Sequence, residues 1–159
     1  MDIQILLGFI LTVLPVSELR GGLPVIVEYT VRNGLSIWPY FLLVLVLNIS
    51  IILIIFMFFD FLHELLMRTR IYRKIISGVL IRLQKNVDKV QRRMDNWGYL
   101  ALMLFVAVPL PGTGAWTGTL VAWAMGLNRQ KSFVAIALGV IIAGLLILFA
   151  SLGFFSGIY

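Results

Sequence analysis

The chain has 159 residues, of which 61% are hydrophobic and only 13% are charged. Soluble domains carry about 25% charged residues, and a chain this small leaves a large share of its surface exposed. The composition therefore excludes a soluble enzyme and predicts a single membrane domain over residues 1–159. The chain has no cysteine, which excludes disulfides and thiolate chemistry. The formal net charge of +6 bears first on topology.

The first part of the chain holds two short apolar runs separated by a break. Residues 3–14 are apolar but too few to cross a bilayer, which takes about 20 residues. Residues 15–24 contain two prolines, two glycines, Glu18 and Arg20, and a second short apolar run follows at 25–31. Such a break ends a helix, and broken backbone at membrane depth needs cover from protein or water. We therefore expect a helical hairpin here.

The next two segments differ sharply in charge. Residues 38–59 carry no charge and begin with Trp38 and Tyr40, which predicts a transmembrane helix with aromatic anchors. Residues 60–96 contain nine Lys/Arg and four Asp/Glu, with apolar residues in heptad spacing. This pattern predicts an amphipathic helical arm outside the lipid. The heptad residues are Ile76, Leu80, Leu83, Val87, Val90 and Met94.

The last part of the chain repeats the order of the first. A short apolar run at 97–108 ends in a Pro/Gly-rich break at 109–118, a second short run follows at 119–125, and residues 132–155 carry no charge. Paired hydrophobic segments that are broken by Gly and Pro are typical of transporters built from repeats. We therefore expect two repeats, at 3–59 and 97–155.

The basic residues predict how these segments are oriented. Besides the nine in 60–96, Arg129 and Lys131 lie in the loop 127–131. The positive-inside rule places both segments in the cytoplasm, so residues 97–126 must enter the membrane and return. We expect an all-α integral membrane fold in a cell membrane: an inverted repeat of a re-entrant hairpin plus a transmembrane helix, with a cytoplasmic arm. The alternative is a four-helix bundle with kinked first and third helices.

The first break supplies candidate functional residues. Ionisable groups within a membrane are functional candidates by default. Arg20 is a candidate fixed cation for an anionic headgroup, and the desolvated Glu18 is a candidate proton carrier. Gly21 and Gly22 join them as candidate substrate contacts. The alternative is an ion pair that only holds the hairpin together.

The second break has no charge but offers backbone donors. Glycines permit close approach of backbone to a ligand, and successive amides at a helix start form an anion site. The alternative role is tight packing of the hairpin. The candidate substrate contacts here are Pro111, Gly112, Thr113, Gly114, Trp116 and Thr117.

Two further polar positions have open interpretations. Asn48, in the middle of the first long helix, either hydrogen-bonds across helices or contacts cargo. His63 lies near Asp60 and Glu64, as an interfacial polar cluster or as a metal or proton-relay site. We expect no catalytic residue, no resident metal and no cofactor.

Residues 18–24 and 109–118 together resemble the small multidrug export family, and the resemblance covers nearly the whole chain. That family is distantly similar to the DedA superfamily. The resemblance implies two re-entrant hairpins and movement of lipids, including polyprenyl phosphates, driven by protons. It also matches Glu18 and Arg20 to the acidic and basic residues of the hairpin motifs. DedA proteins typically carry an arginine in the second motif, whereas residues 112–118 contain none.

These observations favour a transporter or flippase for an anionic lipid, a polyprenyl phosphate or a phospholipid, coupled to protons. The alternatives are an exporter of drugs, other small molecules or ions, and a structural membrane protein organised by the arm. We do not expect an enzyme, because the chain has no cysteine, one histidine and no paired intramembrane carboxylates. The expected partners are membrane lipids and a second copy of the chain, without nucleic acid, since membrane orientation already accounts for the basic residues.

Overall fold

The computed structural model describes residues 2–67, 97–110 and 112–158. These residues form helices and contain no strand, so the all-helical prediction is confirmed for the described part of the chain. Most of the predicted arm, including its heptad residues, and Pro111 lie outside the described residues. The helices are α1 (Ile3–Val13), α2 (Glu18–Arg32), α3 (Trp38–Met67), α5 (Trp97–Ala107), α6 (Ala115–Ala124) and α7 (Arg129–Phe155).

Two of the helices, α3 and α7, are long and apolar enough to cross a membrane. Their candidate spans are Trp38–Leu65 and Arg129–Phe155, which confirms the two predicted long apolar helices. Large apolar side chains at three- and four-residue spacing stay exposed along α7, a pattern that suits lipid rather than water as the surroundings. These side chains are Val134, Leu138, Ile142, Leu146 and Phe149.

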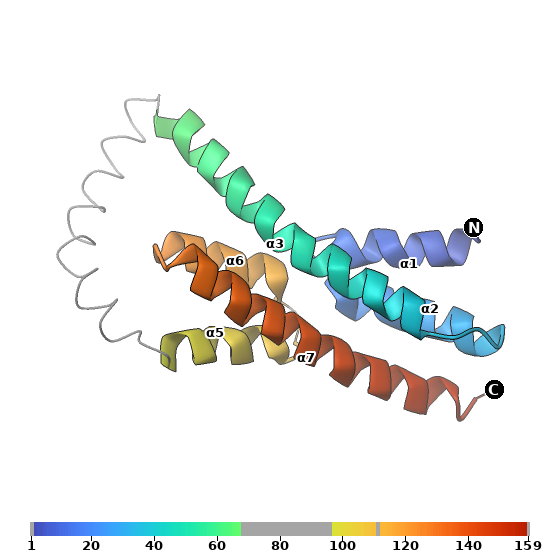
Figure 1. Ribbon diagram of the computed structural model, residues 1–159. Coiled ribbons are helices and arrows are strands. Elements are labelled where there is room, and N and C mark those ends of the chain that lie inside the picture. The colour runs from blue at the N-terminus through green and yellow to red at the C-terminus, as the bar shows by residue number, and fades with distance from the viewer. Residues whose placement is uncertain (1, 68–96, 111, 159) are drawn as a thin grey trace.

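The short helices form two hairpins at opposite ends of the molecule (Figure 1). The α1–α2 hairpin lies at the end that also holds both chain termini, and the α5–α6 hairpin lies at the other end. Helices α3 and α7 run the length of the molecule beside both hairpins. The hairpin tips therefore meet near the middle of the molecule, where side chains from one tip bond the other.

The first break is shorter than predicted. The expected break at 15–24 was too long: only residues 14–17 are non-helical, and Gly21, Gly22 and Pro24 lie inside α2. A Cβ at Gly22 would collide with the backbone of α1, at the Thr12 nitrogen. Gly22 therefore lets two helices approach closely instead of ending one.

The second break and the end of α3 also differ from prediction. Helix α6 begins at Ala115, so Trp116 and Thr117 are helical and the break covers only residues 108–114. Helix α3 continues past the expected end at Phe59 as far as Met67. No glycine or proline interrupts residues 60–67, so nothing in this segment stops the helix.

The core lies where α2, α3, α5 and α7 meet. Its fully buried side chains come from all four helices, which fixes the second part of the chain against the first. Helix α5 packs mainly against α7, where a Cβ at Gly139 would lie 2.6 Å from the Met103 carbonyl oxygen, and α6 packs mainly against α3. The largest buried side chains are Leu23, Ile26, Ile52, Ile55, Val106, Ile136 and Leu148.

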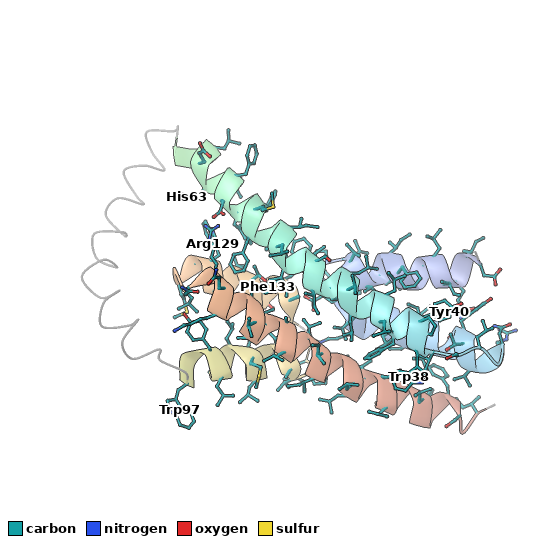
Figure 2. The ribbon with its side chains drawn as sticks, in the orientation of Figure 1. Trp38, Tyr40, His63, Trp97, Arg129 and Phe133 are labelled. Atoms are coloured by element: carbon teal, nitrogen blue, oxygen red, sulfur yellow. The ribbon has the colours of Figure 1, made fainter. Side chains whose placement is uncertain are left out.

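Aromatic and charged side chains mark the two ends of the molecule (Figure 2). Trp38 and Tyr40 lie toward one end, whereas Trp97, His63 and Arg129 lie toward the other. Tryptophan and tyrosine are enriched at both membrane–water interfaces. Trp38 and Tyr40 are therefore separated from Trp97 along the long axis of the molecule, as residues at two membrane–water interfaces would be.

Candidate functional site

The centre of the candidate site is an ion pair at the start of α2. Glu18 is 4% exposed, and the Arg20 side chain is 16% exposed. The Arg20 Nη1 atom lies 3.5 Å from Glu18 Oε2. Among the described residues, Glu18 is the one carboxylate that is buried. Both side chains point from the first hairpin into the break of the second, where each makes further bonds.

The Glu18 carboxylate caps the first turn of α6. Its Oε1 accepts a hydrogen bond of 3.1 Å from the backbone nitrogen of Trp116. Helix starts have unpaired N–H groups and a partial positive charge, which stabilise an anion. Gly114 precedes the helix at φ 145°, and a Cβ there would lie only 2.6 Å from the Glu18 carboxyl carbon. Only glycine therefore admits the carboxylate to this anion site.

The Arg20 guanidinium caps the other side of the same break. Its Nη2 donates to the carbonyl oxygens of Val106 and Val108, each at 3.1 Å, and to Thr113 Oγ1 at 2.9 Å. The last carbonyls of a helix have no partner within the helix and carry partial negative charge. Arg20 thus stabilises the end of α5 as Glu18 stabilises the start of α6.

The second hairpin returns one bond to the first. The Trp116 indole Nε1 donates to the carbonyl oxygen of Val13, the last residue of α1, at 3.2 Å. The two tips therefore cap each other. The charged side chains of the first tip bond backbone groups of the second, and the indole of the second tip bonds a backbone carbonyl of the first. This exchange provides partners for backbone groups at the ends of α1, α5 and α6 that the helices themselves leave unpaired.

The backbone at Glu18 is itself unusual. Its φ is 48°, in the left-handed region that L-residues avoid at a cost of about 1–2 kcal/mol. The backbone nitrogen of Glu18 still donates to the Leu14 oxygen at 2.9 Å, so the turn is closed around this conformation. Strained backbone of this kind clusters at functional sites. Here it directs the carboxylate toward α6.

The structure gathers five of the predicted site residues in one place: Glu18, Arg20, Thr113, Gly114 and Trp116. The Thr113 hydroxyl also donates to Val108 O at 2.7 Å, so it helps to hold the loop.

The other predicted site residues take different positions. Gly21 lies against the Ser17 side chain and Gly22 against α1, while nothing lies within 4 Å of a Cβ built on Gly112. Thr117 has its hydroxyl 3.5 Å from Gly114 O. Pro111 lies outside the described residues.

Asn48 is fully buried in α3. Its Nδ2 donates to the Val44 carbonyl oxygen one turn earlier, at 3.1 Å. Its Oδ1 has no hydrogen-bond partner within the part of the chain that the structure describes. Of the two predicted roles, the hydrogen bond to another helix is not formed among the described residues, because the side-chain amide donates to its own helix, and the contact with cargo stays a prediction.

A second polar cluster lies at the end of the molecule that holds the α5–α6 hairpin. Asp60 accepts from Trp123 Nε1 at 3.1 Å and forms a two-point ion pair with Arg129, with contacts of 2.7 and 2.6 Å. The His63 ring lies edge-on to Trp123, 5.9 Å between centroids. Asp60 thus bonds side chains of α6 and α7 at the end of α3 where the sequence predicts a polar cluster with His63 and Glu64. Within the described residues, no group of three His, Asp or Glu side chains is placed to hold a metal.

Sequence reasoning missed the backbone carbonyl groups of the site and the Asp60–Arg129 pair. Carbonyl acceptors have no sequence signature, because every residue carries one. Arg129 gave a weak signal: it was assigned only to orientation, although a charge at the start of an apolar helix also needs a counter-ion.

Comparison with models of known protein families shows to which family the chain belongs. The profile of the family described as "Putative small multi-drug export protein" matches residues 18–146, which include Glu18, Arg20 and the second break. The chain belongs to this family. Its membership, with two long apolar helices, makes it a membrane protein. Comparisons with curated proteins and with solved structures found no match. The match does not reach the DedA superfamily, so that part of the resemblance stays a prediction.

Proposed function

We propose that this small multi-drug export family member is a proton-coupled transporter of amphiphilic anions, a phosphate-bearing lipid above all. In this proposal the anion takes the position that the Glu18 carboxylate now fills. The observation that carries it is the bond from Trp116 N to Glu18 at the start of α6, beside Arg20. A helix start together with an arginine is the donor set that binds phosphate groups.

The proposal includes a topology. Helices α1, α5 and α6 have 11, 11 and 10 residues and rise about 15–17 Å at 1.5 Å per residue. The hydrocarbon core is about 30 Å thick, so each hairpin enters from one face, turns near the midplane and returns. Residues 60–96 and 127–131 then lie in the cytoplasm of a multi-pass protein in the cell membrane. The two halves form an inverted repeat.

Protonation of Glu18 sets the coupling between proton and anion. An ionised Glu18 neutralises Arg20 and occupies the donors of α6, so the site has no attraction for a second anion. A protonated Glu18 has no negative charge to hold it there, and its departure leaves Arg20 and the α6 amides for the anion. Proton and anion therefore bind together and move in the same direction across the membrane.

The path itself needs more protein than one chain offers. Two hairpins and two long helices make a thin wall around a polar site, so the proposal includes two copies of the chain per transporter. It includes neither a catalytic residue nor a cofactor. The Asp60–Arg129 pair lies at the end of the molecule that holds the α5–α6 hairpin, where it holds the α6–α7 turn against α3.

A second candidate is an exporter of drugs, here cationic ones, since the family is described by multi-drug export. In that case Glu18 binds the drug cation directly, and Arg20 is the internal counter-charge that the drug displaces. Proton and drug then compete for the same carboxylate, so they move in opposite directions. The sign of the coupling to pH separates the two functions.

The test uses proteoliposomes containing the full chain and a pH gradient. A fluorescent short-chain lipid phosphate and a fluorescent phosphatidylcholine report lipid movement, and the cation ethidium reports drug movement. We expect the lipid phosphate to move from the acidic to the basic side at least tenfold faster than phosphatidylcholine. Arg20→Gln should slow it at least tenfold, because charge-assisted hydrogen bonds contribute about 1.5–3 kcal/mol each.

Glu18→Gln, which mimics the protonated acid, should keep the movement but remove its dependence on pH. The matched controls are Glu28→Gln and Arg32→Gln, which change the same charges elsewhere on α2. Unchanged lipid movement in folded Arg20→Gln would contradict the proposal. Ethidium movement toward the acidic side, lost in Glu18→Gln and without lipid movement, would establish the second candidate instead.

A further inference from the structure

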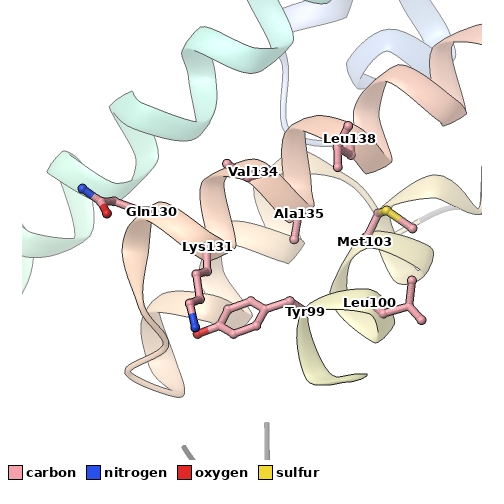
Figure 3. A pocket seen from close by; sticks show the side chains of 8 residues that line it. All are labelled: Tyr99, Leu100, Met103, Gln130, Lys131, Val134, Ala135 and Leu138. Atoms are coloured by element: carbon pink, nitrogen blue, oxygen red, sulfur yellow. The ribbon is translucent and has the colours of Figure 1, made fainter. Parts of the chain in front are cut away.

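A groove of about 510 Å³ lies on the outside of the molecule between α5 and α7 (Figure 3). Its walls are apolar over most of their area, formed by Leu100, Met103, Val134 and Leu138. One end is polar, where the Lys131 side chain extends toward Tyr99. The groove thus has the two-part character of a lipid: a long apolar surface that ends at a cation.

We infer that this groove binds one molecule of an anionic phospholipid. The headgroup lies at Lys131 and Tyr99, and one acyl chain lies along Met103, Val134 and Leu138. Lys131 and Leu138 are seven residues apart on α7, a rise of about 10 Å. This length accommodates the upper part of an acyl chain below its headgroup.

The polar end is complementary to a phosphate. The Lys131 ammonium lies 5.7 Å from the centre of the Tyr99 ring, and an ammonium has three hydrogens to donate. The Tyr99 hydroxyl accepts from Asn128 N at 3.2 Å, and a phenol can donate at the same time. Among the described residues, no acidic side chain lines the groove. The nearby Asp60 is already paired with Arg129.

The position of the groove along the molecule also fits a lipid. Val134 is 56% exposed on a helix that is apolar enough to cross a membrane, so the surroundings of this wall are acyl chains. Trp97, two residues before Tyr99, is 78% exposed at the same end of α5. Exposed tryptophan lies at headgroup level in membrane proteins. Lys131 therefore lies at the level of the negatively charged headgroup of the lipid.

This binding site is separate from the pair formed by Glu18 and Arg20. The groove lies by the first turns of α5 and α7, whereas Arg20 caps the last carbonyls of α5. A bound lipid here would be resident instead of transported. The inference therefore stands or falls independently of the proposed function.

Native mass spectrometry of the purified full chain, with equal amounts of phosphatidylglycerol and phosphatidylcholine, tests the inference. We expect one phosphatidylglycerol per chain to be retained, at about tenfold over phosphatidylcholine, since a charge-assisted contact contributes about 1.5 kcal/mol or more. Lys131→Gln should remove the preference, and Val134→Trp or Leu138→Trp should fill the groove and remove both lipids.

The control variants are Arg32→Gln, which removes an exposed charge elsewhere, and Leu146→Trp, on the same exposed stripe of α7 but outside the groove. Both should bind like the wild type. Equal retention of the two lipids by the wild type would overturn the inference. So would an unchanged preference in Lys131→Gln, or equal retention by Val134→Trp and Leu146→Trp.

Discussion

The two hairpins differ in how their helices pack against each other. The first closes on itself, because Gly8 and Gly22 let α1 and α2 approach until their backbones are in contact. The two helices of the second hairpin are spread apart, because α5 packs mainly against α7 and α6 packs mainly against α3. The first tip carries Glu18 and Arg20, whereas the described residues of the second tip carry no charge.

The difference shows that one hairpin supplies the polar groups that the other lacks. Each break leaves backbone donors and acceptors without partners inside a helix. The second hairpin pairs some of these groups within its own loop, through Thr113, and Glu18 and Arg20 reach across to bond the Trp116 nitrogen and the Val106 carbonyl oxygen. The charges that hold the two tips together are the same ones that we propose for transport.

The largest effect is expected where the first hairpin closes. Gly22→Leu places a side chain against the backbone of α1, which cannot move aside without opening the hairpin. We expect no folded protein in detergent by size-exclusion chromatography. Gly118→Leu meets a side chain, Val106, instead of backbone and should lower stability without abolishing the fold. The control Gly153→Ala, with nothing within 4 Å, should behave like the wild type.

The second-largest effect is expected at the contact between the two hairpins. Arg20→Met leaves the buried Glu18 carboxylate without its counter-ion and the α5 carbonyls without a donor. We expect the free energy of unfolding in mixed micelles to fall by about 3–5 kcal/mol. The double variant with Glu18→Gln should lose less than the sum of the two single changes. Additive losses would mean that the two side chains act independently.

The bond that runs from the second hairpin to the first should matter less. Trp116→Phe keeps an aromatic side chain but removes the donor to Val13 O, leaving a part-buried acceptor without this bond. We expect a loss of about 1–2 kcal/mol in the same unfolding measurement. Trp38→Phe, at an exposed position, is the matched control and should cost less than 0.5 kcal/mol. Equal losses in both variants would remove Trp116 from the exchange between tips.

The smallest effect is expected away from the tips, at the Asp60–Arg129 pair. Both side chains are partly exposed, so Asp60→Asn should lower stability by only about 0.2–1 kcal/mol. Glu64→Gln, one turn further along α3, is the control. A loss above about 2 kcal/mol in thermal unfolding would show that this end, and not the tip contact, holds the second hairpin.

The long helices could be predicted because each is a run of more than twenty residues without a charge. The positions of the two breaks could be predicted, but their lengths could not. Gly22 and Pro24 were interpreted as ending a helix, whereas a packed neighbour can make glycine favourable inside one. Only the structure shows whether a glycine serves a turn, as Gly114 does, or a close contact, as Gly22 does.

The candidate site was half predictable. Glu18 and Arg20 are conspicuous as charges among apolar residues, and the glycines of the second break predict either an anion site or tight packing of the hairpin. The occupant of that site was not predicted, because the chain brings Glu18 to a residue 98 positions away through the packing of four helices. The acceptors of Arg20 are backbone carbonyls, which no residue type marks.

The central claim is that the two hairpins enter the membrane from opposite faces and meet. It is tested most directly by labelling single cysteines with a membrane-impermeant maleimide in cells and in inverted vesicles, which is clean because the chain has no native cysteine. Ile3→Cys and Leu35→Cys should label from one face only, and Glu64→Cys and Gln130→Cys from the other only. Labelling of positions 3 and 35 from opposite faces would make α1 and α2 one kinked span and contradict the account.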